Sequence, residues 1–153
     1  MCGIVAVTGY KKALPLLING LEKLEYRGYD SAGIAIINSE TNSITCNKAE
    51  GKLKNLISIV NEENISGTVG IGHTRWATHG KPEVKNAHPH TNSSETIAVV
   101  QNGIIENFQD LKNKLEKEGI IFNSDTDTEV IPHLIERELN TLSKLNLENN
   151  GST

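Results

Sequence analysis

The sequence predicts an α+β fold in a single domain. Short apolar runs rich in β-branched residues, such as Ile4–Val7 and Ile34–Ile37, are typical of buried strands. Leu14–Leu24 carries apolar residues at helical spacing, with charged residues on the other side, and predicts an amphipathic helix that packs on a sheet. The length of 153 residues fits one domain, and a hydrophobic content of 37% is enough for an ordinary core.

The chain begins Met1-Cys2-Gly3, directly before the first predicted strand. Removal of Met1 would place a thiol and a free α-amine on the same residue, Cys2. An α-amine has a pKa of about 7.7–8.0, so near neutral pH it can accept the thiol proton and leave the nucleophilic thiolate. Nucleophile and base would then share one residue. The alternative is a buried N-terminal strand that follows a cysteine by chance.

The first helix leads into a glycine-punctuated loop, Tyr26–Gly33 (YRGYDSAG), which precedes the next apolar strand. Loops that enter strands often carry function, and this one crowds polar side chains, Arg27 and Tyr29 among them, between two core elements. The alternative is an ordinary turn held by an arginine–aspartate pair. Beyond it, Ser43–Ala49 predicts a strand that completes a hairpin, and Lys52–Val60 predicts a short helix.

Thr68–His73 predicts a strand with glycines where another backbone comes close. The strand delivers Arg75 and Trp76, followed by Thr78 and His79. The planar guanidinium fork binds both oxygens of a carboxylate, and the neighbouring polar side chains can add donors. In the alternative interpretation, Arg75 pairs with an internal acid and Trp76 is a core residue.

A long irregular loop follows at Lys81–Ser94, and a loop of this length inside a compact domain is often functional. His79, His88 and His90 are close in sequence, which raises the possibility of a small zinc-binding module. The chain has neither an HExxH nor a CxxC motif, so the sequence disfavours a metal site.

Thr96–Gln101 predicts a buried strand that ends in Asn102 and Gly103. An Asn-Gly pair is the strongest short signal for a hairpin with a type I′ turn. The segment after it, however, predicts a helix at Asn107–Lys117 with its apolar residues turned inward. A strand–Asn-Gly–helix connection instead suits a site where an asparagine amide and a glycine N–H point at a developing oxyanion.

The last part of the chain predicts a brief strand at Ile120–Phe122 and a capping box at Thr126–Glu129. Asp127 lies at the head of the following helix, where it can receive a substrate ammonium group. Pro132 is expected to remove a backbone hydrogen bond from that helix and bend it. Leu139–Thr153 is polar and predicts no closing element.

Composition excludes several classes of protein. The net charge is −4 and no Lys/Arg cluster is present, which argues against nucleic-acid binding. No apolar run approaches the roughly 18 residues of a membrane span, and no secretory signal is recognisable. Two cysteines, Cys2 and Cys46, do not suggest a disulfide framework, and Cys46 is expected to be a small buried residue. A cytoplasmic protein is the simplest interpretation.

With these segments placed, Cys2 to about Glu138 resembles the N-terminal glutaminase domains of the glutamine–fructose-6-phosphate aminotransferase family. The resemblance rests on CGIV at 2–5, YRGYDSAG at 26–33, HTRWATHG at 73–80, NAHPH at 86–90, NGIIEN at 102–107 and TDTEV at 126–130. It implies a four-layer α/β/β/α sandwich of the N-terminal-nucleophile class. It further implies that residues 2–153 are one amidotransferase domain, truncated at its C-terminal end, with the isomerase domains absent.

The resemblance also implies the chemistry. Cys2 would attack the side-chain amide of L-glutamine to give a γ-glutamyl thioester and ammonia, while Asn102 and the Gly103 N–H form the oxyanion hole. Arg75 would hold the substrate α-carboxylate, and Asp127 would hold the α-ammonium. A zwitterionic amino acid needs one fixed cation and one fixed anion, so charge logic agrees with this pair.

Further roles follow for the other motif residues. Arg27 would support the site, and Tyr29 and Trp76 would belong to loops that close over glutamine. Thr78 and His79 would assist in binding the carboxylate. The remaining candidate, in the NAHPH motif, is His88, to which the resemblance gives no definite role. No metal or other cofactor is implied.

The chain departs from the family pattern in composition and in length. Gln101 stands where a histidine often precedes Asn-Gly, and Pro132 is unusual in its helix. Fructose 6-phosphate would be bound only by the missing domains, and the full-length enzyme is expected to be a homodimer. This chain would at most hydrolyse glutamine. The alternative is an inactive fragment that acts at most as a structural or interaction module.

Overall fold

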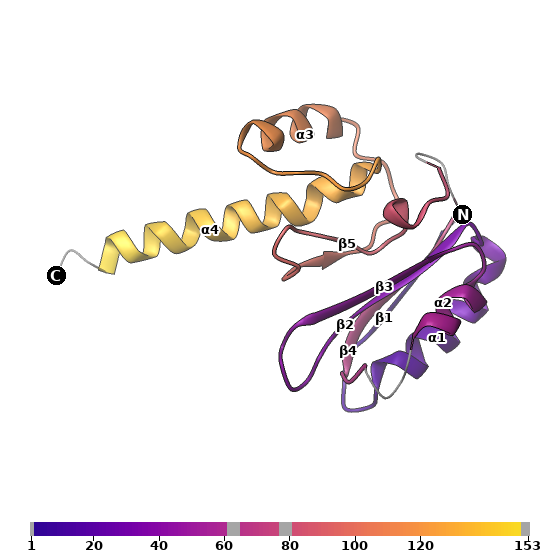
Figure 1. Ribbon diagram of the computed structural model, residues 1–153. Helices are drawn as coiled ribbons and strands as arrows, with labels where there is room; N and C mark the ends of the chain where they lie inside the picture. The colour runs from indigo at the N-terminus through magenta and orange to yellow at the C-terminus, as the bar shows by residue number, and fades with distance from the viewer. Residues whose placement is uncertain (1, 61–64, 77–80, 151–153) are drawn as a thin grey trace.

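The computed structural model describes residues 2–60, 65–76 and 81–150. The chain forms four layers: a pair of helices, a four-stranded sheet, a two-stranded sheet, and a second pair of helices (Figure 1). The first half contains β1 (Gly3–Val7), α1 (Ala13–Leu24), β2 (Ser31–Ile37), β3 (Ile44–Glu50), α2 (Leu53–Ile59) and β4 (Val69–Arg75). The second half contains β5 (His90–Thr91), β6 (Ala98–Val99), α3 (Phe108–Lys117) and α4 (Val130–Asn150). Single 3-10 turns occur at η1 (Glu25–Arg27), η2 (Val84–Asn86) and η3 (Asp127–Glu129).

The first sheet has the strand order β1-β4-β2-β3, and all its pairs are antiparallel. Gly3 lies opposite Thr74, and Ser31 lies opposite Arg75. The start of β1, the start of β2 and the end of β4 therefore meet at one edge of the sheet. As a result, Cys2 lies beside Trp76, the residue directly after β4.

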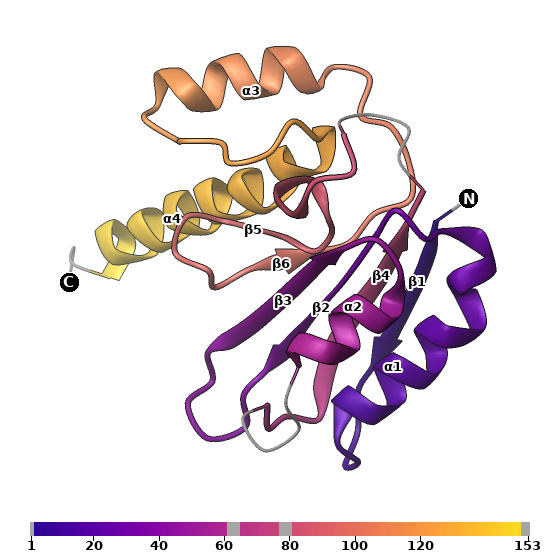
Figure 2. The same cartoon turned by 45° about the vertical axis from the view of Figure 1, so that its right-hand side comes forward.

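Helices α1 and α2 cover one face of this sheet, as Figure 2 shows. Leu17 and Leu21 of α1 are fully buried in one cluster with Ile34 of β2. Glycines in β4 provide the space for these side chains, because a Cβ on Gly72 would lie 3.0 Å from Cδ1 of Leu21. The expected close approach of another backbone at these glycines was wrong at Gly72, because the approaching groups there are side chains of α1 and β2.

The second sheet lies on the opposite face of the first and is short. His90 pairs with Val99, and the apolar segment Thr96–Gln101 is half-buried and forms only the two-residue strand β6. The predicted buried strand there is thus shorter and more exposed than expected. Backbone packs directly on backbone between the two layers, since a Cβ on Gly33 would collide with the carbonyl oxygen of His88.

The C-terminal part differs from its sequence-based expectations. Ile120–Phe122 lies within the described residues and forms no strand. Helix α4 continues to Asn150, through a segment predicted to have no element. Because α4 begins at Val130, Pro132 lies in its first turn, where the missing N–H would have no partner within the helix in any case. The expected loss of a hydrogen bond at Pro132 was wrong for this reason.

The capping box was also wrong. Thr126 precedes η3 without a side-chain capping bond among the described residues, and its hydroxyl lies 2.8 Å from Nε2 of His90. Glu129 instead accepts hydrogen bonds from the backbone N–H groups of Asn123 and Ser124. The two residues therefore anchor the second sheet and the loop before η3.

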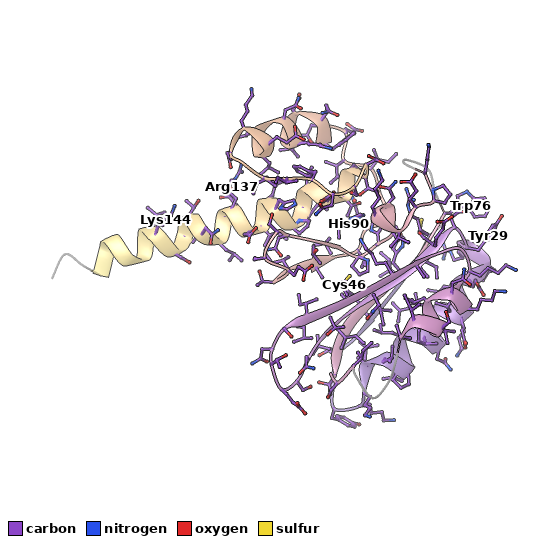
Figure 3. All side chains as sticks on the ribbon, viewed as in Figure 1. Tyr29, Cys46, Trp76, His90, Arg137 and Lys144 are labelled. Carbon is purple, nitrogen blue, oxygen red and sulfur yellow. The ribbon has the colours of Figure 1, made fainter. Side chains whose placement is uncertain are left out.

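The other predicted helices agree closely with the structure. None of the described helices is both long enough and apolar enough to span a membrane. Cys46 of β3 is half-buried on the face toward the second sheet (Figure 3), and burial raises the pKa of its thiol. Cys2 and Cys46 are both free thiols.

We expect Gly33→Ala to lower the free energy of unfolding by about 1–3 kcal/mol, because the added methyl group meets the His88 backbone and forces the sheets apart. Urea denaturation of the variant and the wild type measures this difference. Gly103→Ala is a matched control, since its Cβ would meet only the flexible end of Gln101, at 3.0 Å. Equal effects of the two substitutions would contradict the proposed packing.

Candidate active site

The N-terminal thiol is held at the edge of the first sheet by strand pairing. Cys2 directly precedes β1 and Trp76 directly follows β4, so the pairing of these strands brings the two residues together. The backbone N–H of Trp76 donates to Sγ of Cys2 at 3.1 Å, and the carbonyl oxygen of Trp76 lies 3.5 Å from the same sulfur. The two contacts fix the position of the sulfur relative to the end of β4.

The Asn-Gly segment lies against the same terminus. Nδ2 of Asn102 donates to the carbonyl oxygen of Cys2 at 3.1 Å, and Oδ1 of Asn102 is 2.8 Å from Nε2 of His73. Neither Asn102 nor Gly103, both described, has the positive φ that a type I′ turn requires, and the chain continues into α3. The hairpin alternative is therefore wrong, and the strand–Asn-Gly–helix connection is confirmed.

These groups face a pocket of about 550 Å³. Most of the predicted site residues line it: Cys2, Arg27, Arg75, Trp76, His88, Asn102, Gly103 and Asp127. Sequence reasoning assigned no place in the pocket to its other lining residues: Gln101, Ile104, Thr126 and Thr128. Their only sequence signal was their position inside or next to the motifs.

Two predicted residues, Thr78 and His79, lie outside the described part of the chain. Tyr29 does not line the pocket but makes an edge-to-face contact with Trp76, with ring centroids 5.3 Å apart. Figure 3 shows the two rings beside the N-terminal end of the sheet. Trp76 is 43% exposed, so its alternative interpretation as a core residue was wrong.

The pocket holds one buried cation and one anion from different layers. Arg75 ends β4 and is 4% exposed, and its Nη1 donates to the carbonyl oxygen of Lys81 at 3.2 Å. Burial lowers the pKa of Arg75, while the charges of Cys2, Asp30 and Asp127 oppose that shift. The loop before β2 packs tightly here, because a Cβ on Gly28 would lie 2.7 Å from the backbone of Arg75.

The anion comes from the turn η3, which leads into α4. Oδ2 of Asp127 accepts the backbone N–H of Ile105 at 2.7 Å, which ties the acid to the segment after Asn-Gly. Glu129 anchors the same turn and is 2% exposed. Burial alone would raise the pKa of Glu129, but His133 and the N–H groups of Asn123 and Ser124 lower it to about 2. A buried, ionised glutamate thus fixes the turn that presents Asp127.

Three histidine rings pack against one another between the two sheets, His73 stacked on His88 and His90 edge-to-face with His88. The ring centroids of His73 and His88 are 4.3 Å apart, and those of His88 and His90 are 4.7 Å apart. Burial lowers the pKa of His73 to about 4 and that of His90 to about 3, and it also lowers the pKa of His88. Positive charges on Arg75 and Lys48 act in the same direction on His88 and His90. All three rings are therefore neutral at pH 7.

The described residues do not support the zinc-module hypothesis. Within 2–60, 65–76 and 81–150, no group of three or more His, Cys, Asp or Glu side chains is arranged to hold a metal ion. His79, which completed the zinc-module hypothesis, lies outside these ranges.

Comparison with known sequences gives a consistent picture. The glutamine amidotransferase domain family matches residues 57–146. A glutamine–fructose-6-phosphate aminotransferase (isomerizing) from Clostridium perfringens is 58% identical over 136 residues, which are 89% of this chain and 22% of that protein. The protein of the same name from Thermosynechococcus vestitus is 59% identical over 135 residues, or 88% of this chain and 21% of the relative. The chain thus spans about a fifth of the curated relatives it matches.

Solved structures agree. The glutamine phosphoribosylpyrophosphate amidotransferase of Bacillus subtilis, complexed with ADP and GMP, is 30% identical with a TM-score of 0.74. The match covers 90% of this chain and 29% of the neighbour. A structure titled as the allosteric regulatory enzyme of purine biosynthesis is 31% identical with a TM-score of 0.76, over 90% of this chain and 30% of that one. The predicted N-terminal-nucleophile fold class is confirmed, as is the family resemblance.

The buried neutral histidines predict that the free energy of unfolding decreases in mild acid. The ordinary histidine pKa is 6.5, and His73 and His90 stay neutral down to about pH 4 and 3 when folded. Between pH 6.5 and 4 the unfolded chain therefore binds more protons, and each histidine lowers the free energy of unfolding by about 1.4 kcal/mol per pH unit. Above pH 6.5 these groups contribute no pH dependence.

Urea titrations at pH 7.5, 6.0 and 5.0 measure this dependence. His90→Gln keeps a hydrogen-bonding group toward Thr126 but removes one titrating ring, so its stability should decline less steeply with acid. Glu129 contributes little in this range, because its protonation in the unfolded chain is centred near pH 4.5 and its pKa in the folded chain is about 2. A stability that stays constant from pH 6.5 to 5.0 would contradict burial of neutral rings.

Proposed function

The chain belongs to the glutamine amidotransferase family, and from that premise we propose that it is the glutamine-hydrolysing part of an enzyme that makes glucosamine 6-phosphate. The observation that carries the proposal is one pocket that combines the Cys2 thiol, the Asn102 amide and the opposite charges of Arg75 and Asp127. The substrate of the amidotransferase domain is L-glutamine. The relatives named glutamine–fructose-6-phosphate aminotransferase support fructose 6-phosphate as the acceptor of the ammonia.

In the proposed reaction, the thiolate of Cys2 attacks the side-chain carbonyl carbon of glutamine. The α-amine, free once Met1 is removed, accepts the thiol proton and passes it to the leaving nitrogen, so that the C–N bond breaks and ammonia departs. A γ-glutamyl thioester remains on Cys2. Water then attacks the thioester, glutamate leaves, and the thiol is restored.

Two donors are proposed for the oxyanion that forms in each step. They are the side-chain N–H of Asn102 that does not bond Cys2, and the backbone N–H of Gly103. Both residues line the pocket beside the thiol. Removing one such donor typically costs about 100- to 1000-fold in rate, so their placement matters as much as that of the nucleophile.

The two ends of the amino acid are assigned by charge. Arg75 binds the α-carboxylate, with Thr78 and His79 proposed as further donors. Oδ2 of Asp127 accepts the Ile105 N–H at 2.7 Å, whereas Oδ1 has only a long contact of 3.5 Å with the Thr128 hydroxyl, so Oδ1 is the oxygen proposed for the α-ammonium. Arg27 supports the site from the pocket wall, and His88 forms part of that wall.

Trp76 and Tyr29 are proposed to close over bound glutamine. Their edge-to-face contact joins the loop before β2 to the end of β4 at the exposed side of the site. A closed pair would keep water from the thioester while ammonia leaves.

The rest of the enzyme is inferred from the longer relatives. We propose that residues 2–153 form one amidotransferase domain, that fructose 6-phosphate is bound by domains beyond it, and that the whole enzyme is a cytoplasmic homodimer. No metal, nucleic acid or membrane is needed for the proposed chemistry. The competing proposal is an inactive structural or interaction module, which the following experiment separates from an enzyme.

The first test is covalent labelling with 6-diazo-5-oxo-L-norleucine, a glutamine analogue with an electrophile at the reacting carbon. Intact mass should show loss of Met1 and a single adduct, mapped to Cys2. Cys2→Ala should abolish both the adduct and glutamine hydrolysis. Cys46→Ser is the control and should label like the wild type. Retention of Met1, or labelling of Cys46 in preference to Cys2, would support the inactive module.

The second test separates the two ends of the substrate. Asp127→Asn should lower kcat/KM for glutamine at least tenfold, because a charge-assisted hydrogen bond is worth about 1.5–3 kcal/mol. The same variant should hydrolyse glutaramate, which lacks the α-amine, as well as the wild type does. Arg75→Lys should lower kcat/KM for glutamine and for glutaramate. It should hydrolyse 4-aminobutanamide, which lacks the α-carboxylate, as well as the wild type does. Uniform losses for all three substrates would contradict the assignment.

A further inference from the structure

We propose that His73 is a positioning residue for the oxyanion hole, because its Nε2–H fixes the rotation of the Asn102 side-chain amide. The inference rests on the proposed function and adds a residue to it. His73 does not line the pocket and touches no substrate in this proposal. It acts only through the 2.8 Å contact between its Nε2 and Oδ1 of Asn102.

The hydrogen-bond partners determine which way the amide points. The carbonyl oxygen of Cys2 can only accept, so the Asn102 atom 3.1 Å from it must be the NH₂ nitrogen. Oδ1 of Asn102 then faces His73 and requires a donor there. In the flipped orientation two acceptor oxygens would face each other at Cys2. With the amide fixed in this way, one N–H is bound to Cys2 and the second remains available to the pocket.

The surroundings of His73 make its Nε2 the donor. The ring is completely buried, and its lowered pKa keeps it neutral, so it carries one N–H. By donor–acceptor geometry, Nδ1 of His73 has no hydrogen-bond partner among the described residues. The backbone of Gln101 also interacts with the ring and, like Asn102, opposes the lowering of its pKa. A proton on Nδ1 would be unsatisfied and would also leave two acceptors facing each other at Asn102. Both costs are avoided when the proton resides on Nε2.

Packing fixes the ring plane as well as the proton. His73 belongs to β4, which lies between β1 and β2 in the sheet, and it is paired with Ile4 of β1 and with Gly33 of β2. His88 stacks on the ring at 4.3 Å, with an interplanar angle of 17°. The pairing of β1 with β4 that brings Cys2 to Trp76 therefore also fixes the position of His73 along β4. The positions of the proposed nucleophile and of the Asn102 amide thus depend on the same strand pairing.

Kinetics of single variants test the proposal. His73→Met fills the space without a donor and should lower kcat at least tenfold, with KM for glutamine within about threefold of the wild type. His73→Gln has a donor the same number of bonds from the backbone and should recover most of kcat. Ile36→Val is the control, since it loosens the buried core at β2, outside the pocket and away from the residues that hold Asn102 or Asp127. Its kcat should equal that of the wild type.

An unchanged kcat in His73→Met would overturn the proposal, and so would equal losses in His73→Met and His73→Gln. A role in folding alone predicts that kcat follows thermal stability across the three variants, whereas the proposal predicts recovery in His73→Gln at any stability.

Nitrogen NMR of the wild-type chain provides a readout that needs no activity. At pH 7 the His73 ring should be neutral and protonated at Nε2, and the side-chain NH₂ of Asn102 should exchange slowly with water. His73→Met should speed that exchange. A proton on Nδ1 of His73 would overturn the proposal. If the expected tautomer is present but Cys2 neither labels nor hydrolyses glutamine, the proposed function fails while the contact stands.

Discussion

The antiparallel pairing of β1 with β4 is the constraint on which the site depends. Its register, with Gly3 opposite Thr74, places Cys2 beside Trp76 and puts His73 on the face toward the second sheet. Because side chains alternate along a strand, a slip of one residue would turn His73 to the helical face and separate the thiol from the Trp76 N–H. The leucines of α1 pack on the glycines of β4 and oppose such a slip, so core packing and catalytic geometry are set by the same contacts.

Local sequence patterns predicted the elements whose burial follows a simple period. The bounds of helices α1, α2 and α3 and of strand β3 were predicted to within one residue, whereas β2 begins three residues before the predicted strand Ile34–Ile37. The helices were predicted well because each has one clearly apolar face. The pattern failed where a segment's partner lies far away in the chain. The expected strand at Ile120–Phe122 has no strand to pair with, and the predicted capping role of Glu129 was replaced by bonds to the loop before η3.

The sequence named most of the residues that line the pocket but not the contacts between them. Arg75 and Asp127 could be assigned from charge, and Asn102 from an unusual Asn-Gly before a helix. The contacts between His73 and Asn102 and between Thr128 and Gln101 (2.9 Å) join residues more than 25 positions apart in different layers. No periodicity reports such pairs. The sequence shows only that a polar residue lies inside or next to a motif. It does not show which residue that side chain forms a hydrogen bond with.

The position of Cys2, immediately before an edge strand, has a consequence for how the protein is made. Any residue in front of Cys2 turns the α-amine into an amide, which is not a base, and the thiol then has no proton acceptor of its own. Under the proposed function the protein is therefore inactive as long as Met1 precedes Cys2. An aminopeptidase that removes Met1 would activate the protein. A purification tag fused in front of Cys2 would leave the protein folded but without glutaminase activity.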